Sequence, residues 1–97
     1  MSDAGIGYLQ ELERVIEQRK AASAEQSYTA RLYAAGPSRI AQKLGEEAVE
    51  LALASVQGNR QRTLSEAADL VYHLLVLLRS HDLTLADVAR ELSQRQR

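Results

Sequence analysis

The sequence predicts an all-α protein of four to five helices, and three observations support this fold class. Strong helix breakers are few: Pro37 is the sole proline, and Gly36 and Gly58 mark the clearest interruptions. Between them, apolar residues recur at helical spacing, and no segment alternates apolar and polar residues as a half-buried strand does. Because 97 residues suffice for one domain, we expect residues 1–97 to form a single helical domain.

The segments have recognisable start and stop signals. The expected helices run from Tyr8 to Ala24, Ser27 to Ala35, Pro37 to Gln57, Thr63 to His81 and Leu85 to Gln94. Gly36 suits a left-handed C-cap, and a proline is tolerated in the first turn of the helix that follows. Thr63 and Glu66 have capping-box spacing, and Thr84 and Asp87 repeat a similar start. The short connections favour antiparallel neighbours.

Composition excludes several classes of function. The net charge of -1 predicts no attraction to nucleic acid or to anionic membranes, and four tyrosines as the only aromatics leave little for base stacking. The absence of cysteine excludes disulfides and thiolate metal sites. The first five residues lack a signal-peptide pattern, and the longest apolar run, Leu74 to Leu78, is too short to span a bilayer. We therefore expect a soluble, cytoplasmic protein.

Charged residues gather on one side of the segment that begins at Pro37. At 100° per residue, five of them share an arc of about 100°: Arg39, Lys43, Glu46, Glu47 and Glu50. Apolar stripes border this arc on both sides, one being Ile40, Leu44, Ala48 and Leu51, the other Val49, Leu53 and Val56. An ordinary surface helix has one such stripe. Two stripes predict packing on both sides, with the acids lining a cleft.

In the expected helix from Thr63 to His81, the stretch from Ala67 to Leu78 is apolar nearly all round, which is typical of a central, buried helix. Asp69, Tyr72 and His73 interrupt this stretch, and Glu66 lies one turn before Asp69. Glu66, Asp69 and His73 share one face. An ionised carboxylate is rarely buried without a partner, so a cation should face Asp69. That cation is either a metal ion or a Lys or Arg from another helix. A lone histidine is more often a satisfied core residue than a functional one.

Antiparallel packing of these two helices would bring four or five carboxylates together. Such a group repels itself unless a divalent cation lies among them, and oxygen-only ligands favour magnesium or manganese. Magnesium in turn binds substrate phosphates. The alternative for Glu46 is a solvated helix face, where glutamates at this spacing are common.

These residues resemble the MazG-like all-α nucleotide pyrophosphohydrolases, and within them the phosphoribosyl-ATP pyrophosphatase branch. The resemblance covers about 65 residues. It is carried by Ser27-Tyr28-Thr29-Ala30, Lys43-Leu44-Gly45-Glu46-Glu47-Ala48, Glu50, Glu66-Ala67-Ala68-Asp69-Leu70 and Tyr72-His73. The chain includes no cyclohydrolase-like portion, so the resemblance is to the single-function form.

The resemblance implies hydrolysis of N1-(5-phosphoribosyl)-ATP to N1-(5-phosphoribosyl)-AMP and pyrophosphate, the second step of histidine biosynthesis. It also implies magnesium as cofactor, with manganese as the alternative, and a homodimer whose subunits complete a four-helix core around each site. The single-domain length and the two apolar stripes agree with a dimer.

The resemblance also assigns roles to residues. Glu47, Glu50, Glu66 and Asp69 are the expected metal ligands. Glu46 and Glu47 are the catalytic candidates, with Glu46 either a further ligand or the base that takes the proton of water. Lys43 and Arg39, and less directly Arg31, are expected to hold substrate phosphates. His73 is expected to orient Asp69 or to contact substrate.

Two other classes of function remain open from the sequence. One is a house-cleaning pyrophosphohydrolase that acts on ordinary or damaged nucleoside triphosphates. The Ser27-Tyr28-Thr29-Ala30 and Tyr72-His73 segments favour the histidine-pathway branch instead. The other is a non-enzymatic helical interaction module, in which the acids serve only as salt-bridge partners.

Overall fold

The computed structural model describes residues 5–95 and is all-α over that range, as predicted. The helices are α1 (Tyr8–Arg19), α2 (Tyr28–Ala35), α3 (Pro37–Val56), α4 (Arg60–Ser80) and α5 (Leu85–Arg95). Residues 1–4, on which most of the signal-peptide argument rests, lie outside the described residues, as do residues 96–97. Within residues 5–95, no helix is both long enough and apolar enough to cross a membrane.

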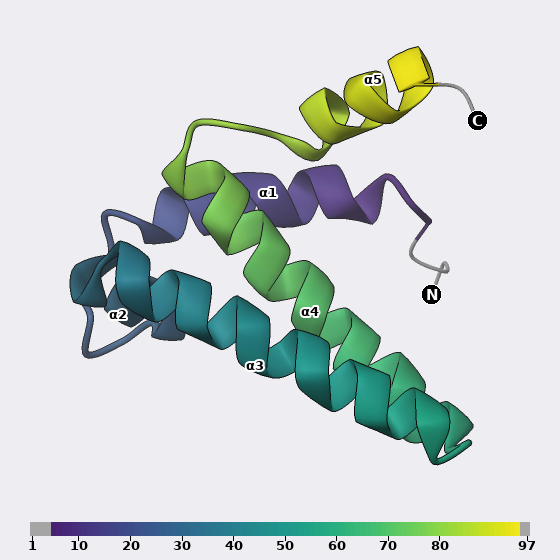
Figure 1. Cartoon of the computed structure of the whole chain (residues 1–97). Coiled ribbons are helices and arrows are strands. Elements are labelled where there is room, and N and C mark those ends of the chain that lie inside the picture. The colour runs from purple at the N-terminus through teal and green to yellow at the C-terminus, as the bar shows by residue number, and fades with distance from the viewer. Residues whose placement is uncertain (1–4, 96–97) are drawn as a thin grey trace.

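The fold is organised around an antiparallel hairpin of α3 and α4 (Figure 1). A short turn at Gly58 joins the two helices, and they lie side by side over most of their length. Helix α1 packs against α4 and α2 against α3, both at the end of the hairpin away from this turn. The expectation that short connections give antiparallel neighbours is confirmed for this pair.

The caps explain where the helices begin. Ser27 Oγ accepts a hydrogen bond from the Ala30 amide at 3.2 Å, and Thr84 and Asp87 exchange side-chain-to-amide bonds as predicted. The predicted start of α4 at Thr63 is wrong. Asn59 is the N-cap, because its Oδ1 accepts from the Arg62 amide at 2.9 Å and adds a full turn before Thr63.

Two further boundaries depend on backbone conformation and on packing. Gly36 has φ of +99°, which L side chains rarely adopt, so only glycine joins α2 to α3 this tightly. Helix α1 ends at Arg19 rather than at the predicted Ala24. Beyond Ile16 the segment has no large apolar residue to pack, and the Ser23 hydroxyl instead supports a turn by accepting from the Glu25 amide.

The core lies at one end of the hairpin. Its buried members are Ile16, Leu32, Ile40, Leu75 and Val76, which come from α1, α2, α3 and α4. Only the C-terminal half of α4 is therefore buried, and the expectation that the whole helix would be buried is wrong for the single chain. Among the helices of residues 5–95, only α3 lies along the N-terminal half of α4, and Leu64 in this half is 65% exposed.

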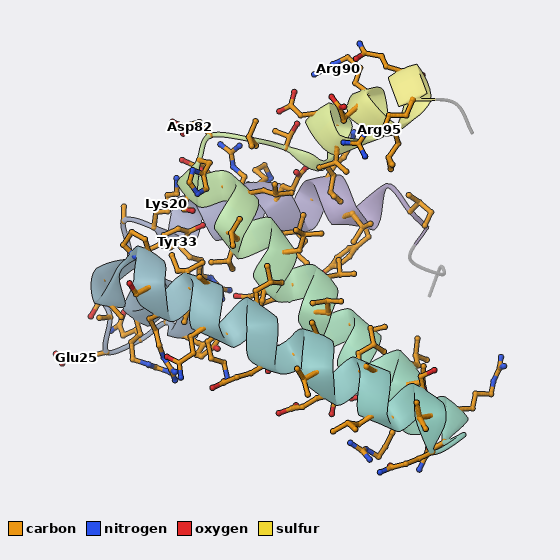
Figure 2. All side chains as sticks on the ribbon, in the orientation of Figure 1. Lys20, Glu25, Tyr33, Asp82, Arg90 and Arg95 are labelled. Carbon is orange, nitrogen blue, oxygen red and sulfur yellow. The ribbon has the colours of Figure 1, made fainter. Side chains whose placement is uncertain are left out.

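Lys20 and Tyr33 fasten the C-terminal end of α4 to α1 and α2 (Figure 2). Lys20 Nζ donates to the Arg79 carbonyl at 2.7 Å, and the Tyr33 hydroxyl donates to the Val76 carbonyl at 2.7 Å. Lys20 Nζ also lies 5.3 Å from the centre of the Tyr33 ring. The Arg79 carbonyl also accepts from the Asp82 amide at 3.3 Å, so the Lys20 bond adds a second donor at the end of α4.

We expect the alkaline stability of the protein to depend on Tyr33. Burial, reinforced by Glu17, raises the pKa of this phenol from 10.0 to about 12. A raised pKa in the folded state gives stability that is complete below pH 10 and is lost as the pH rises towards 12. Tyr33→Phe should therefore unfold with a shallower dependence on pH over that window, as followed by circular dichroism in urea. Tyr8→Phe, at an exposed position, is the control, and an unchanged slope in Tyr33→Phe would contradict the assignment.

Candidate metal and substrate site

Helix α3 places a carboxylate at a packing position. Its buried residues are Ile40, Glu47 and Ala54, spaced by seven, which is the spacing of one side of a helix lying along a partner. Glu47 is the charged member of this otherwise apolar row, and it is nevertheless only 7% exposed. The charged arc seen in the sequence thus overlaps the contact with α4.

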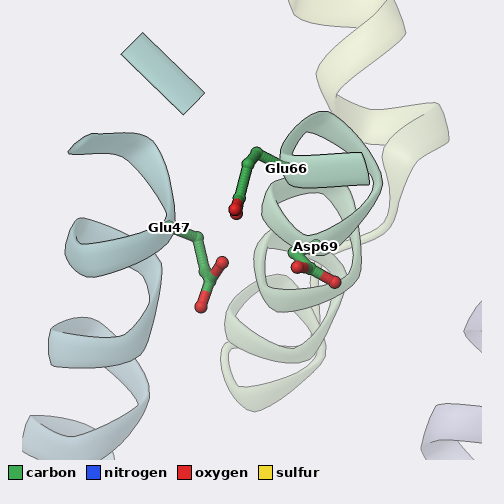
Figure 3. A group of neighbouring side chains, drawn as sticks. All are labelled: Glu47, Glu66 and Asp69. Carbon is green, nitrogen blue, oxygen red and sulfur yellow. The ribbon is translucent and has the colours of Figure 1, made fainter. Parts of the chain in front are cut away.

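Glu47 faces Glu66 and Asp69 across the hairpin (Figure 3). Each of the three side chains offers one oxygen, and these atoms all lie within 4.8 Å of one another. Glu66 and Asp69 come from successive turns of α4, whereas Glu47 comes from the middle of α3. The antiparallel pairing of the two helices therefore brings together carboxylates that are 19 to 22 residues apart in sequence.

The geometry of these carboxylates suits a hard divalent cation. Among residues 5–95, Glu47 Oε1 and Glu66 Oε1 are buried side-chain oxygens with no hydrogen-bond partner. Burial raises the pKa of Glu66, and so do the like charges of Glu50, Glu47 and Asp69. Unpartnered, mutually repelling carboxylate oxygens are what a magnesium or manganese ion would satisfy.

The other two predicted acids lie outside this group of three. Glu50 lies close enough to Glu66 to raise its pKa. Glu46 is exposed and turns towards Gln42 and Lys43, whose nitrogens lie 3.0 and 3.6 Å from its carboxylate. The Gln42 hydrogen bond and then the charges of Lys43 and Arg39 lower the pKa of Glu46, although partial burial acts in the opposite direction. It is therefore ionised at neutral pH.

The predicted phosphate-binding cations lie on the side of the acids nearer α2. Lys43 Nζ is 3.6 Å from Glu47 Oε2 and also 3.6 Å from Glu46 Oε1. Burial opposes the charge of Lys43, but Tyr28, Glu46 and Glu47 outweigh it and raise its pKa. Arg39 is exposed one turn before Lys43, and Arg31 is exposed on α2. The structure thus brings Lys43 onto the acids and leaves the two arginines beside them.

His73 contacts the backbone of Asp69 and not its carboxylate. Its Nδ1 lies 2.7 Å from the Asp69 carbonyl, and its Nε2 lies 2.8 Å from the Tyr28 hydroxyl. Because a carbonyl only accepts, Nδ1 carries the hydrogen, and Nε2 of the neutral ring accepts from Tyr28. A second bond joins Thr29 Oγ1 to the Tyr72 hydroxyl. His73 and Tyr72 together hold the start of α2 against α4.

Comparison with known proteins then identifies the family. The family model described as phosphoribosyl-ATP pyrophosphohydrolase matches residues 9–96. The chain belongs to this family. The phosphoribosyl-ATP pyrophosphatase of Methylobacterium nodulans is 55% identical to it over 87 residues, 90% of this chain and 81% of that protein. The corresponding protein of Pyrobaculum aerophilum is 54% identical over 88 residues, 91% of this chain and 94% of that one.

Some members of the phosphoribosyl-ATP pyrophosphohydrolase family are longer. The histidine biosynthesis bifunctional protein of Pasteurella multocida is 56% identical over 88 residues, which is 91% of this chain but 44% of that protein. The chain thus spans less than half the length of the bifunctional relatives that it matches.

Sequence reasoning missed Arg62 and underrated Tyr28 as neighbours of this family's acidic site. Arg62 precedes the predicted helix start at Thr63, but it lies in the first turn of α4 with its Nη2 3.8 Å from Glu66 Oε2. The i,i+4 spacing of Arg62 and Glu66 was a usable signal once the helix is known to begin at Arg60. No comparable signal existed for Tyr28, because its contact with His73 joins residues 45 positions apart.

We expect Glu66→Gln to stabilise the metal-free protein at neutral pH. The raised pKa of Glu66 means that its contribution to folding is complete below about pH 4.5 and is lost as the pH rises through the folded-state pKa. Glutamine cannot ionise, so Glu66→Gln does not lose this stability as the pH rises. Thermal unfolding with a chelator, from pH 4.5 to 8, should therefore show a flatter curve for Glu66→Gln than for the unsubstituted protein. Added magnesium should raise the melting temperature of the unsubstituted protein and have a much smaller effect on the variant.

Glu25→Gln provides the matched control, since this exposed carboxylate lies outside the acidic group (Figure 2). It should leave the pH dependence and the magnesium response unchanged. A magnesium response that persists in full in Glu66→Gln would contradict a metal site at these carboxylates.

Proposed function

We propose that this protein hydrolyses N1-(5-phosphoribosyl)-ATP to N1-(5-phosphoribosyl)-AMP and pyrophosphate, the second step of histidine biosynthesis. Membership of the phosphoribosyl-ATP pyrophosphohydrolase family supports the reaction class. The observation that carries the site is the meeting of Glu47, Glu66 and Asp69 with buried, unpartnered oxygens. Because the substrate is an ATP derivative, we assign the protein to the cytoplasm.

We assign magnesium, with manganese as the alternative, to Glu47, Glu50, Glu66 and Asp69. When bound, the ion supplies charge neutralisation for the triphosphate and a lowered pKa for water. Glu47, Glu66 and Asp69 have converging oxygens, and Glu50 lies beside Glu66. The oxygen-only character of this set supports these metals over zinc or copper.

We assign the remaining roles from the same geometry. Lys43 holds oxygens of the triphosphate, because its ammonium already lies against the acids, and Arg39 and Arg31 contribute further phosphate contacts. Glu47 and Glu46 are the catalytic carboxylates. Glu46 accepts the proton of the attacking water, since it lies outside the group of three converging acids and is ionised. His73 positions Tyr28 and the backbone of Asp69.

We further propose that the protein works as a homodimer. Val49, Leu53 and Val56 form the second apolar stripe of α3, and the single chain leaves them 59%, 54% and 86% exposed. Leu64, in the second turn of α4, is also exposed, and it lines one groove together with Ser55 near the end of α3. A contiguous apolar face on a small domain favours burial by a second copy, and two such hairpins would complete a four-helix core.

The proposed function makes a prediction about activity and substrate specificity. With magnesium, the protein should release pyrophosphate from phosphoribosyl-ATP, and a chelator should abolish the release. Standard nucleoside triphosphates should be turned over poorly, and efficient turnover of them would favour a house-cleaning enzyme.

Asp69→Asn should lower kcat by about 100-fold or more, because loss of a residue that binds the metal directly costs at least as much as loss of a residue that only supports a ligand. Full activity in Asp69→Asn would refute the metal assignment, and inactivity on every substrate would favour an interaction module.

The proposed homodimer makes a prediction about the mass of the protein in solution. Sedimentation at micromolar concentration should give twice the chain mass for the unsubstituted protein and the chain mass for Leu53→Glu, since a charge at this stripe opposes burial. Leu92→Glu is the control, because Leu92 is equally exposed but lies on α5. A monomeric unsubstituted protein, or a dimer that survives Leu53→Glu, would overturn this interface.

A further inference from the structure

A groove beside the acidic site has two arginines in its lining. Its volume is about 360 Å³, and its polar lining consists of Tyr28 and Arg31 from α2 and Arg39 from α3, while Leu32 and three alanines form the rest. The groove is separate from the three converging carboxylates, none of which lines it.

Within residues 5–95, neither of the two guanidinium groups forms a salt bridge with a carboxylate. Several other arginines within residues 5–95 pair with a carboxylate, among them Arg14, Arg62, Arg79, Arg90 and Arg95. Over the same part of the chain, neither Arg31 nor Arg39 has a carboxylate oxygen within 4.0 Å. Arg31 instead donates to the Ala24 carbonyl at 3.2 Å and lies 5.8 Å from the centre of the Tyr28 ring. Two unpaired cations in one groove repel each other, and an anion between them would relieve that repulsion.

The groove is joined to the acidic site through Tyr28. The ring of this residue lines the groove, while its hydroxyl donates to His73, whose other nitrogen donates to the Asp69 backbone. Arg39 and Glu47 are eight residues apart on one helix, which is about 12 Å along its axis. A ligand that reaches from the groove to a cation held by the carboxylates therefore needs anionic groups at two separated ends.

We propose that this groove binds the 5-phosphate of the phosphoribosyl group, through Arg31 and Arg39, while Lys43 holds the triphosphate at the acidic site. The inference rests on the proposed function. It assigns the triphosphate to the acidic site and the 5-phosphate to the groove of Arg31 and Arg39. Phosphoribosyl-ATP carries its monoester phosphate and its triphosphate on different riboses, joined through the adenine. A phosphate monoester is a compact dianion that guanidinium groups bind with paired hydrogen bonds. ATP lacks this second phosphate, so the groove would also explain a preference for phosphoribosyl-ATP.

Steady-state kinetics of Arg39→Gln, Arg31→Gln and the double variant test the assignment. Loss of a hydrogen bond to a charged group weakens binding about tenfold or more, so each single variant should raise KM for phosphoribosyl-ATP by about that factor. The kcat should stay within about twofold, because the groove is remote from the bond that breaks. Arg90→Gln is the control, since Arg90 lies on α5, away from α2 (Figure 2). Arg39→Lys should restore part of the loss.

A substrate analogue without the 5-phosphate, N1-ribosyl-ATP, gives the decisive comparison. The unsubstituted protein should use it with a kcat/KM at least about tenfold below that for phosphoribosyl-ATP. The double variant should show nearly equal kcat/KM for the two substrates, because the arginines and the phosphate are partners in one interaction. A general loss of structure would lower both values and leave their ratio unchanged.

Three outcomes would overturn the proposal. They are equal use of both substrates by the unsubstituted protein, an equal loss on both substrates in the double variant, and an unchanged KM in all three variants. An equal loss in a double variant that circular dichroism shows to be folded would place the arginines on the triphosphate instead. Absence of turnover of phosphoribosyl-ATP by the unsubstituted protein would refute the proposed function itself, so the two failures are distinguishable. If the double variant does not fold, as judged by circular dichroism, Arg39→Gln alone decides, since this side chain is exposed.

Discussion

The carboxylate of Glu47 inside the α3–α4 contact is the constraint on which the rest of the site depends. It occupies a position in the same row as Ile40 and Ala54, where an apolar residue would pack better. Desolvation of a charge costs several kcal/mol unless partners compensate it, and Lys43 at 3.6 Å meets only one of the two oxygens. The hairpin thus gives up packing at its centre to hold acids that converge on one point.

Most of the stabilising contacts of the fold lie at the end of the hairpin away from the turn at Gly58. There the buried cluster of α1, α2, α3 and α4 and the bonds of Lys20 and Tyr33 to the last turns of α4 fix the helix as a rigid support. The bond from Tyr28 to His73 transfers that rigidity to the start of α2. Arg31 and the groove it lines are consequently held in a constant position relative to Asp69, which a site for a two-ended ligand requires.

The exposed apolar stripe of α3 follows from the size of the chain. Helices α3 and α4 have 20 and 21 residues, and the shorter helices α1 and α2 cover only one end of this hairpin. The half of α4 that carries Glu66 and Asp69 therefore has α3 on one side and no helix of the described chain on the other. Covering this half with a second copy would also lower the dielectric around the acids. The proposed dimer and the proposed metal site would then be physically coupled, because a drier site strengthens every interaction of the carboxylates with a cation.

The sequence by itself determined the helices and the face on which each helix carries its acids, because both depend on local rules. Apolar periodicity and glycine positions located the helices to within a few residues, and the i,i+3 spacing put Glu66 and Asp69 on one face. The family resemblance favoured Glu47 as a ligand and left the place of Glu46 open. The tertiary structure supplied the physical reason why Glu47 faces Glu66 and Asp69 while Glu46 turns to Gln42 and Lys43: adjacent residues on a helix point about 100° apart, and the register of the hairpin selects one. The contact of Tyr28 with His73 and the groove of Arg31 and Arg39 likewise arise from packing between distant segments. The spacing of residues along the sequence does not show which distant segments will be in contact.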